Sequence, residues 1–302
     1  MTDRDPDTPG IEATEGELPS LVDPVLVAAF EGWNDAGEAA STAVEHLELT
    51  WDATALGSVD PEEYYDFQVT RPHVRLSGGV TRRIEWQTTR LSVAEMPGTG
   101  RHVVLVSGIE PNLRWKAFCR ELLGWIERLG VTKVITLGAL LTDIPHTRPT
   151  AITGVSFDRS SAGRLRVEPS SYEGPTGIVG VLQNACVEAG VPAVSFWASV
   201  PHYVSQARVP KAAVALLQVL EEQLDVEVPL GTLPEQAEEW ERTVSEMADE
   251  DEDVRNYVRA LEERGDAAIQ ITEASGDDIA AEFERYLRRR GRGPGWPSTG
   301  PR

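Results

Sequence analysis

Short apolar runs alternate along the chain with longer segments whose apolar residues recur at helical spacing. Each run is long enough for a buried strand, and each following segment places apolar residues three and four positions apart, as on one face of a helix. Strands are expected at 24–30, 102–112, 131–141 and 191–200, and helices at 32–49, 114–130, 177–190 and 210–224. Near-continuous apolar strands that alternate with helices predict an α/β fold with a largely parallel central sheet covered on both faces.

The segment from Thr54 to Ala94 has a different pattern. Its first part contains DPEEYYDFQVTRPHVRL, which is polar and aromatic, and its second part, TRRIEWQTTRLSVAE, alternates apolar and polar residues. The alternation places Ile84 and Trp86 on one face and charged or polar neighbours on the other, which is typical of a half-exposed strand. We therefore expect a strand or hairpin insertion that makes the central sheet mixed.

The two ends of the chain differ from this core. Residues 1–22 are rich in Asp, Glu, Pro, Thr and Gly and show no periodicity, which predicts a disordered acidic leader. The α/β core is expected over 23–228. Residues 229–290 form an acidic extension with two surface helices and a further helix at 277–290, and residues 291–302 are expected to be a flexible tail.

Composition indicates a folded, acidic protein. Hydrophobic residues make up 41% of the chain and charged residues 25%, and the formal net charge is −21. This charge argues against non-specific binding to nucleic acid or to an anionic membrane, because their phosphates would be repelled. The chain shows no signal-peptide pattern and no run of about 18 apolar residues, so we expect a cytoplasmic protein. Cys119 and Cys186 lie in apolar helical patterns, which indicates buried thiols rather than a disulfide.

Polar residues gather where the predicted strands give way to loops. The sequence lacks the phosphate-binding, dinucleotide-binding, nucleophile-elbow and H-E-x-x-H signatures of several enzyme classes. In an open α/β sheet, the ends of the strands are the usual edge for a ligand crevice. The candidate ligand-binding residues at these positions are Asn34, Asp35, Asn112, Asp143, His146, Arg148 and His202.

Three interpretations of these residues remain open. In the first, His146 or His202 is a general base oriented by Asp143, while Arg148 or Arg71 holds an anion such as phosphate or carboxylate. In the second, His73, His146 and His202 bind a metal together with a carboxylate. In the third, which we favour, the residues cap turns, form ion pairs and bond to loop carbonyls. We therefore assign no catalytic residue, no metal and no cofactor.

Two further segments carry candidate contacts. In YEGPTGIVG (172–180), backbone N–H groups near Thr176 and Gly177 could bind an anion at the start of a helix, and the alternative is a plain loop with Thr176 as the cap. In DPEEYYDF, the residues Tyr64, Tyr65 and Phe67 are candidates for a subunit interface, because aromatic side chains bury a large area at little entropic cost. The alternative is an apolar cluster beneath a loop.

Six longer motifs occur in order along the chain. They are FEGWNDAG (30–37), DPEEYYDFQVTRP (60–72), GIEPNLRW (108–115), LGALLTDIPHTRP (137–149), YEGPTGIVG (172–180) and WASVPHYV (197–204). Together they resemble the actinobacterial branch of the proteasome-assembly-chaperone-like family. The similarity spans roughly residues 24–224, and the helical extension is also similar to that branch.

The resemblance implies a three-layer α/β/α sandwich, similar to the nucleoside phosphorylase/hydrolase-like fold, in a homo-oligomer for which we expect a trimer. In eukaryotes, members of the wider family pair to guide assembly of the proteasome's α-ring, and for bacterial members a comparable role is an analogy. We therefore predict an oligomeric assembly-chaperone-like or scaffold protein linked to proteasome subunits. The alternative is a small-molecule enzyme or sensor that binds a phosphorylated or nucleoside-like ligand at the strand-end crevice.

Overall fold

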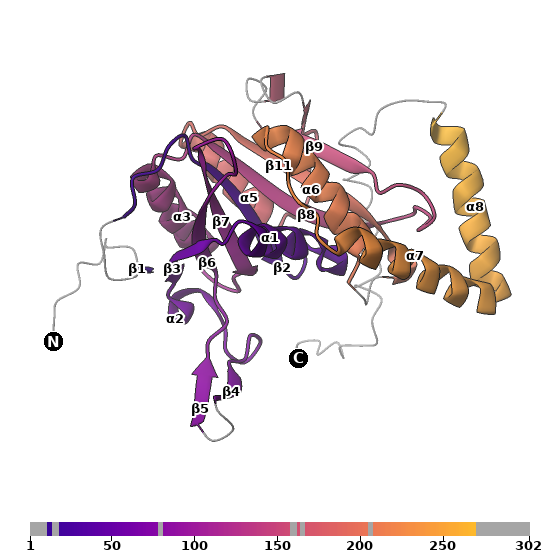
Figure 1. Cartoon of the computed structure of the whole chain (residues 1–302), viewed down its shortest axis with the longest axis horizontal. Helices are drawn as coiled ribbons and strands as arrows, with labels where there is room; N and C mark the ends of the chain where they lie inside the picture. Colours follow the sequence, from indigo (N-terminus) through magenta and orange to yellow (C-terminus); the bar gives the residue numbers. More distant parts are fainter. Residues whose placement is uncertain are drawn as a thin grey trace, which may run out of the picture.

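A nine-stranded mixed sheet forms the centre of the part of the chain that the structure describes (Figure 1). The computed structural model describes residues 11–13, 18–77, 81–157, 162–163, 167–204 and 208–269. The strands of the sheet are β1 (Ile11–Ala13), β2 (Val25–Glu31), β3 (Thr54–Val59), β6 (Arg90–Glu95), β7 (His102–Ile109), β8 (Lys133–Thr142), β9 (Ile152–Ser156), β10 (Glu168–Pro169) and β11 (Ala193–Pro201). Their order is β1-β3-β6-β7-β2-β8-β11-β9-β10.

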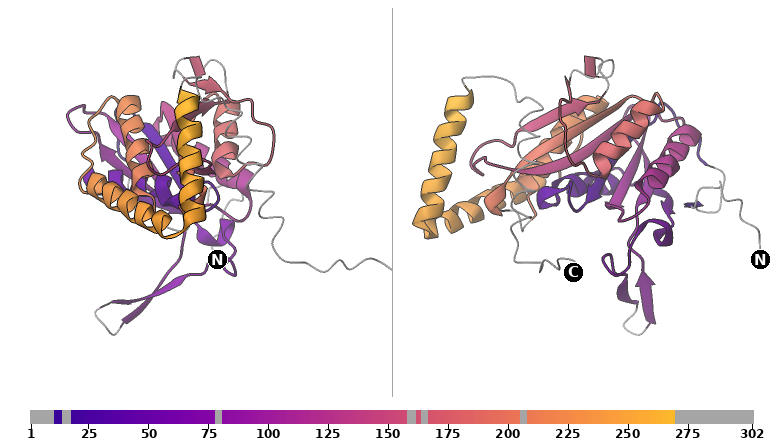
Figure 2. Two further views of the ribbon diagram at one scale, coloured as in Figure 1. Left: turned by 90° about the vertical axis from the view of Figure 1, so that its right-hand side faces the viewer. Right: turned by 180° about the vertical axis from the view of Figure 1, so that it is seen from behind.

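Helices cover both faces of this sheet. Helices α1 (Ala39–Thr50) and α6 (Pro210–Leu224) pack on one face, and α3 (Trp115–Leu129) and α5 (Ile178–Glu188) pack on the other. When the molecule is seen from behind, α3 and α5 lie in front of the sheet (Figure 2). The predicted three-layer α/β/α sandwich is confirmed.

The central strands are apolar on both faces because each face carries its own core. In β2, alternate residues belong to different clusters. Val25, Val27 and Ala29 pack on the side of α1 and α6, whereas Leu26, Ala28 and Phe30 pack on the side of α3 and α5. This two-sided burial explains why the strands appear in the sequence as continuous apolar runs and not as alternating patterns.

The sheet is mixed, as predicted. Its centre is a group of four adjacent parallel strands, β7, β2, β8 and β11. Strand β6 pairs antiparallel with β7, and β3 pairs antiparallel with β6. Strand β9 was not predicted. It follows Pro145 and Pro149, and its buried residues, Val155 and Ser156, are adjacent, so it lacks the alternation of a half-buried strand. It forms by antiparallel pairing with β11, in which Ile152 lies opposite Ala198.

The insertion between β3 and β6 contains a hairpin that projects away from the sheet (Figure 1). A short helix, α2 (Pro61–Tyr64), follows β3, and its first turn is capped by Asp60, whose Oδ1 accepts the N–H of Glu62. Strands β4 (His73–Ser77) and β5 (Thr81–Glu85) then pair antiparallel with each other as a separate two-stranded sheet. The expectation of a hairpin insertion in this segment is confirmed.

Two acidic helices follow α6, as the periodicity predicts. Helix α7 (Leu233–Glu250) packs against α6, and α8 (Glu252–Ile269) packs against α7 at one end of the molecule (Figure 2). Among the described residues, none of the helices combines the length and the apolar character needed to cross a membrane. The helix expected at 277–290 and the tail expected at 291–302 lie outside the described residues.

The prediction that residues 1–22 are disordered is wrong for one short part of this segment. Residues Ile11–Ala13 form β1, which pairs antiparallel with the outer edge of β3. In this pairing Ile11 lies opposite Val59 and Ala13 opposite Gly57. Three residues are too few to show a period-2 pattern, so pairing with β3 and not local sequence defines this strand.

Candidate functional site

The polar residues expected at the strand ends do lie at one edge of the sheet, but they fall into separate groups. Strands β7, β2, β8 and β11 are parallel, so their carboxyl ends share this edge. One group surrounds Glu110, a second caps α1, a third holds the loop after α2, and a fourth lies beneath α7 and α8. In each group the polar atoms bond mainly to other parts of the chain.

The first group brings Asn34 to the start of α5. Asn34 is buried, and its Nδ2 donates to Glu110 Oε1 at 2.7 Å. The same carboxylate oxygen accepts the N–H of Ile178 at 2.8 Å, in the first turn of α5. The anion expected near Thr176 and Gly177 is therefore supplied by the chain itself, because a carboxylate at a helix N-terminus takes the position that a bound anion would occupy.

Glycine is required at position 177 for this arrangement. A Cβ atom at Gly177 would lie 2.2 Å from Asn34 Oδ1, an atom that is itself buried without a hydrogen-bond partner. Thr176 is exposed and does not cap the helix, for which Gly177 is the N-cap residue. Glu110 and Asn112 both follow β7 in the EPN turn, and only Asn112 was kept among the candidates, although Glu110 is the residue that joins the two elements.

The second group consists of Asp35 and the first turn of α1. Asp35 Oδ1 accepts the N–H of Ala40 at 2.6 Å, and Oδ2 accepts the N–H of Ser41 at 3.1 Å. Burial raises the pKa of Asp35 to about 6, while the hydrogen bonds from these two residues act in the opposite direction. Both carboxylate oxygens thus accept hydrogen bonds from the start of the helix. Asp35 therefore has the capping role of the third interpretation.

Asn112 holds a different part of the chain. Its Oδ1 accepts the backbone N–H of Asp66 at 2.9 Å and the hydroxyl of Thr70 at 3.1 Å. Both partners lie in the segment between α2 and the hairpin. Asn112 therefore fixes this segment to the end of β7 and is not joined to the groups formed by the other candidates.

The fourth group joins the strand ends to the acidic helices. Asp143 Oδ1 lies 3.2 Å from Nδ1 of His202 and accepts the hydroxyl of Tyr257, a residue of α8. Arg148 lies 3.9 Å from Glu262 of α8. The candidates Asp143, Arg148 and His202 are thus brought together as predicted, but they contact the helical extension.

His146 is buried at the centre of this group. Its Nε2 lies 2.9 Å from Ser245 Oγ of α7, and its Nδ1 lies 2.8 Å from the hydroxyl of Tyr203, which also accepts the backbone N–H of His146. Because the Ser245 hydroxyl donates to the carbonyl of Glu241, Nε2 must be the donor to that hydroxyl. Burial lowers the pKa of His146, which favours the neutral imidazole, and in that form Nδ1 accepts the Tyr203 hydroxyl.

The space beneath the two helices is small. A cavity of about 260 Å³ lies between the strand-end loop and α7 and α8. Its walls include His146, Thr147, Ser245, Arg255 and Glu262. The Thr147 hydroxyl donates to Glu262 across it at 2.5 Å. The general-base interpretation of His146 is therefore not supported, since both ring nitrogens already have partners.

The buried His146 predicts a pH dependence of stability. Its pKa in the folded chain lies below the unfolded value of 6.5, so the unfolded chain binds the proton more readily, and stability falls as the pH falls through that value. The neighbouring charges of Glu241, Glu262 and Lys211 modulate the effect. We expect the melting temperature of the natural protein, relative to His146→Gln, to fall between about pH 7.5 and about pH 5.5. A constant difference between the two proteins would contradict this role.

The metal interpretation requires three histidines, of which the structure places His73 far from the other two. His73 lies on β4 of the projecting hairpin and contacts Gln87, whereas His146 lies beneath α7. Within the described ranges, no three histidine, cysteine, aspartate or glutamate side chains are grouped as a metal site would need. The three histidines therefore do not form one site.

The interface candidates need a correction. Tyr64 and Tyr65 are only 4% and 3% exposed, so they are core residues and do not offer a surface to a partner. The Tyr64 hydroxyl donates to Glu121, and the Tyr65 hydroxyl contacts Thr89 Oγ1 at 2.8 Å. These hydrogen-bond partners, which come from distant parts of the sequence, allow both rings to enter the core. The alternative of an apolar cluster beneath a loop describes these two residues.

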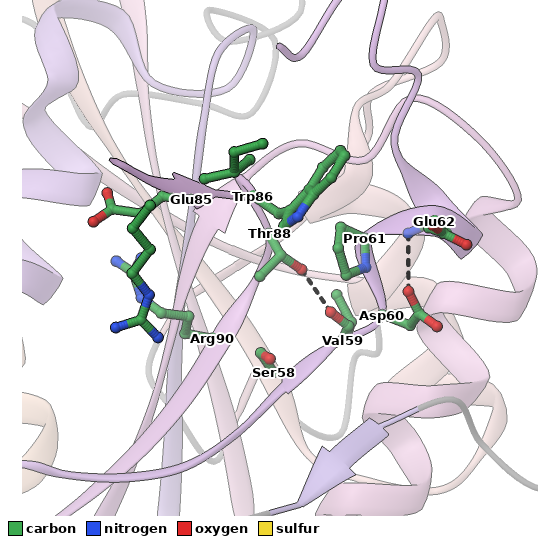
Figure 3. Close-up of a pocket in the computed structure, with 11 residues that line it drawn as sticks. Ser58, Val59, Asp60, Pro61, Glu62, Glu85, Trp86, Thr88 and Arg90 are labelled. Carbon is green, nitrogen blue, oxygen red and sulfur yellow. Dashed lines mark hydrogen bonds between the residues drawn. The ribbon is translucent and has the colours of Figure 1, made fainter. Parts of the chain in front are cut away.

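The third aromatic candidate, Phe67, is half-buried. Its ring packs against that of Trp86 with centroids 4.5 Å apart, at the base of the hairpin. Beside this pair, an open groove of about 680 Å³ separates the end of the hairpin from β3 and α2. Figure 3 shows Trp86 and Arg90 on one side of the groove and Asp60 with Pro61 on the other.

Comparison with known proteins agrees with the resemblance noted in the sequence. The PAC2 family model matches residues 29–248. A PAC2 family protein from Streptomyces avermitilis is 55% identical, with a TM-score of 0.72 over 78% of this chain and 100% of that chain. A proteasome-assembly chaperone homologue from Mycobacterium tuberculosis is 54% identical, with a TM-score of 0.71 over 78% of this chain and 99% of that chain.

A second Mycobacterium tuberculosis protein, of unknown function, matches over a longer range. It is 30% identical, with a TM-score of 0.81 over 96% of this chain and 99% of that chain. No curated protein gave a significant match. The family model covers most of the described sheet, both helical layers and nearly all of α7. The chain belongs to the PAC2 family.

Proposed function

We propose that this chain is a cytoplasmic, homo-oligomeric assembly-chaperone-like or scaffold protein that binds proteasome subunits. The observation that carries the proposal is the 54% identity to a proteasome-assembly chaperone homologue, nearly the whole length of which this chain covers. Such proteins act by presenting surfaces to other proteins and need no reaction centre. The expected oligomer is a trimer.

The hydrogen bonding at the strand ends also supports a binding protein over a small-molecule enzyme or sensor. Glu110 occupies the N-terminus of α5, Asp35 holds the first turn of α1, and His146 bonds to Tyr203 and Ser245. A phosphorylated or nucleoside-like ligand would have to displace these intramolecular partners, and each displaced buried group would cost about 1–3 kcal/mol.

Co-purification tests the proposal. Affinity-tagged full-length chain, expressed in the organism that encodes it, should recover proteasome α-subunits or partly assembled precursors, and an untagged strain processed in parallel serves as the control. Deletion of the gene should increase the amount of unassembled α-subunit. Recovery of neither species, together with normal proteasome assembly in the deletion strain, would contradict the proposal.

A further inference from the structure

We propose that one face of the β4–β5 hairpin is the surface by which one copy of this chain binds the next. The inference rests on the homo-oligomer of the proposed function and names its contact surface. In the hairpin, Val74 lies opposite Ile84 and Leu76 opposite Arg82. Opposed residues of an antiparallel pair share a face, so these four side chains project on the same side.

Apart from Arg82, this face is apolar, and it is open to solvent. Val74, Leu76 and Ile84 are between 55% and 64% exposed, and Trp86, two residues after Ile84, is 47% exposed. An isolated two-stranded hairpin is at best marginally stable in water, and it normally packs its apolar face against something. Contiguous apolar residues on an exposed protrusion are typical of a protein contact.

The charge of the hairpin identifies the partner. Residues 71–90 contain five arginines and one glutamate, a net charge of +4, within a chain whose net charge is −21. Two copies of such an acidic chain repel each other over most of their surface, whereas the hairpin attracts the acidic surface of a neighbour. A second copy of this chain therefore supplies the complementary charge.

The same charges determine how the copies meet. If two copies joined through the same hairpin face, two segments that each carry a net charge of +4 would meet, and like charges at a contact are unfavourable. The hairpin must then bind a different, acidic surface of its neighbour. A contact between different surfaces closes into a ring when the rotation permits, and a trimeric ring fits this requirement.

The groove at the base of the hairpin gives the neighbour room to enter. Arg83 of the hairpin and Arg90 of β6 are among the residues that line it. Trp86 and Arg90 lie on one side of the groove and Asp60 on the other (Figure 3). Arg83 and Arg90 form no ion pair with a carboxylate in the described part of the chain. Acidic side chains of the next copy can therefore pair with both guanidinium groups.

Light scattering coupled to size exclusion tests the inference on the full chain. We expect the natural protein to elute as one closed assembly, and Leu76→Glu combined with Ile84→Glu to elute at the 33.0 kDa of a single chain. Arg82→Glu alone should also weaken the assembly. This variant reverses one charge and leaves the apolar residues of the face unchanged, so it tests the charge separately. The matched control is Leu49→Glu on α1, since Leu49 is 80% exposed and lies outside the hairpin.

Each other outcome is informative. Hairpin variants that keep the natural molar mass, with an unchanged melting temperature, would overturn the inference and leave the homo-oligomer of the proposed function in place. A natural protein that is monomeric at every concentration would overturn both the inference and that homo-oligomer. The co-purification with proteasome subunits is measured separately, so its result does not depend on either outcome.

Discussion

Replacing Gly108 by alanine is expected to lower the free energy of unfolding by about 3 kcal/mol. Gly108 lies near the end of β7, and a Cβ there would lie 2.6 Å from both the carbonyl oxygen of Thr88 and the Cα of Thr89. These atoms belong to the backbone and cannot rotate away. Urea unfolding, followed by circular dichroism, measures the loss.

The clash falls at the point where the hairpin returns to the sheet. The Thr88 hydroxyl donates to the carbonyl of Val59, and Thr89 Oγ1 contacts Tyr65, so displacing either residue disturbs the base of the hairpin. Gly124→Ala is the matched control, because a Cβ at Gly124 in α3 meets no atom within 4 Å. We expect that control to be stabilised by about 0.5–1 kcal/mol. Equal stabilities for the two variants would contradict the close approach.

Replacing Glu110 by alanine is also expected to cost about 3 kcal/mol of unfolding free energy. The change removes the acceptor for Ile178 N–H and leaves Asn34, which is buried, without a partner for either polar atom of its side-chain amide. Chemical unfolding gives the total loss. Hydrogen exchange at the Ile178 amide tests whether the loss is located at the start of α5.

Glu110→Gln separates the hydrogen bonds from the charge. A glutamine keeps one carbonyl oxygen, and a single oxygen, Oε1, serves both donors in the structure. We therefore expect the glutamine variant to lose less than half as much stability as the alanine variant. Similar losses in the two variants would mean that the negative charge at the helix N-terminus, and not hydrogen-bond acceptance, is what stabilises this site.

The parts of the fold that could be predicted are those in which local sequence and tertiary packing agree. Strand β2 and helix α1 follow from an apolar run and a helical period, and both are present. Helix α3 ends at Gly130, as predicted, because that residue adopts the left-handed conformation that a C-cap requires. Strand β9 could not be predicted, because its pairing with β11 defines it and its own sequence has no strand period.

The site was harder to predict, because its partners come from distant parts of the sequence. His146 and Asp143 were expected at a ligand crevice, and their position at the strand ends was predicted correctly. The residues that satisfy them, Ser245 and Tyr257, lie on α7 and α8, and nothing in the local pattern places those helices over this edge. For the same reason the burial of Tyr64 depends on an acceptor, Glu121, that sequence pattern does not reveal.

The position of β2 also determines when the sheet can form during synthesis. Among the four parallel strands β2 is made first, yet its neighbour β7 is translated only after the hairpin insertion, and its other neighbour β8 only after α3 as well. Both edges of this apolar strand stay unpaired on the ribosome until β7 is made, and the edge that pairs with β8 stays unpaired for longer; such edges are prone to aggregate. A chain proposed to assist the assembly of other proteins thus needs shielding early in its own biosynthesis.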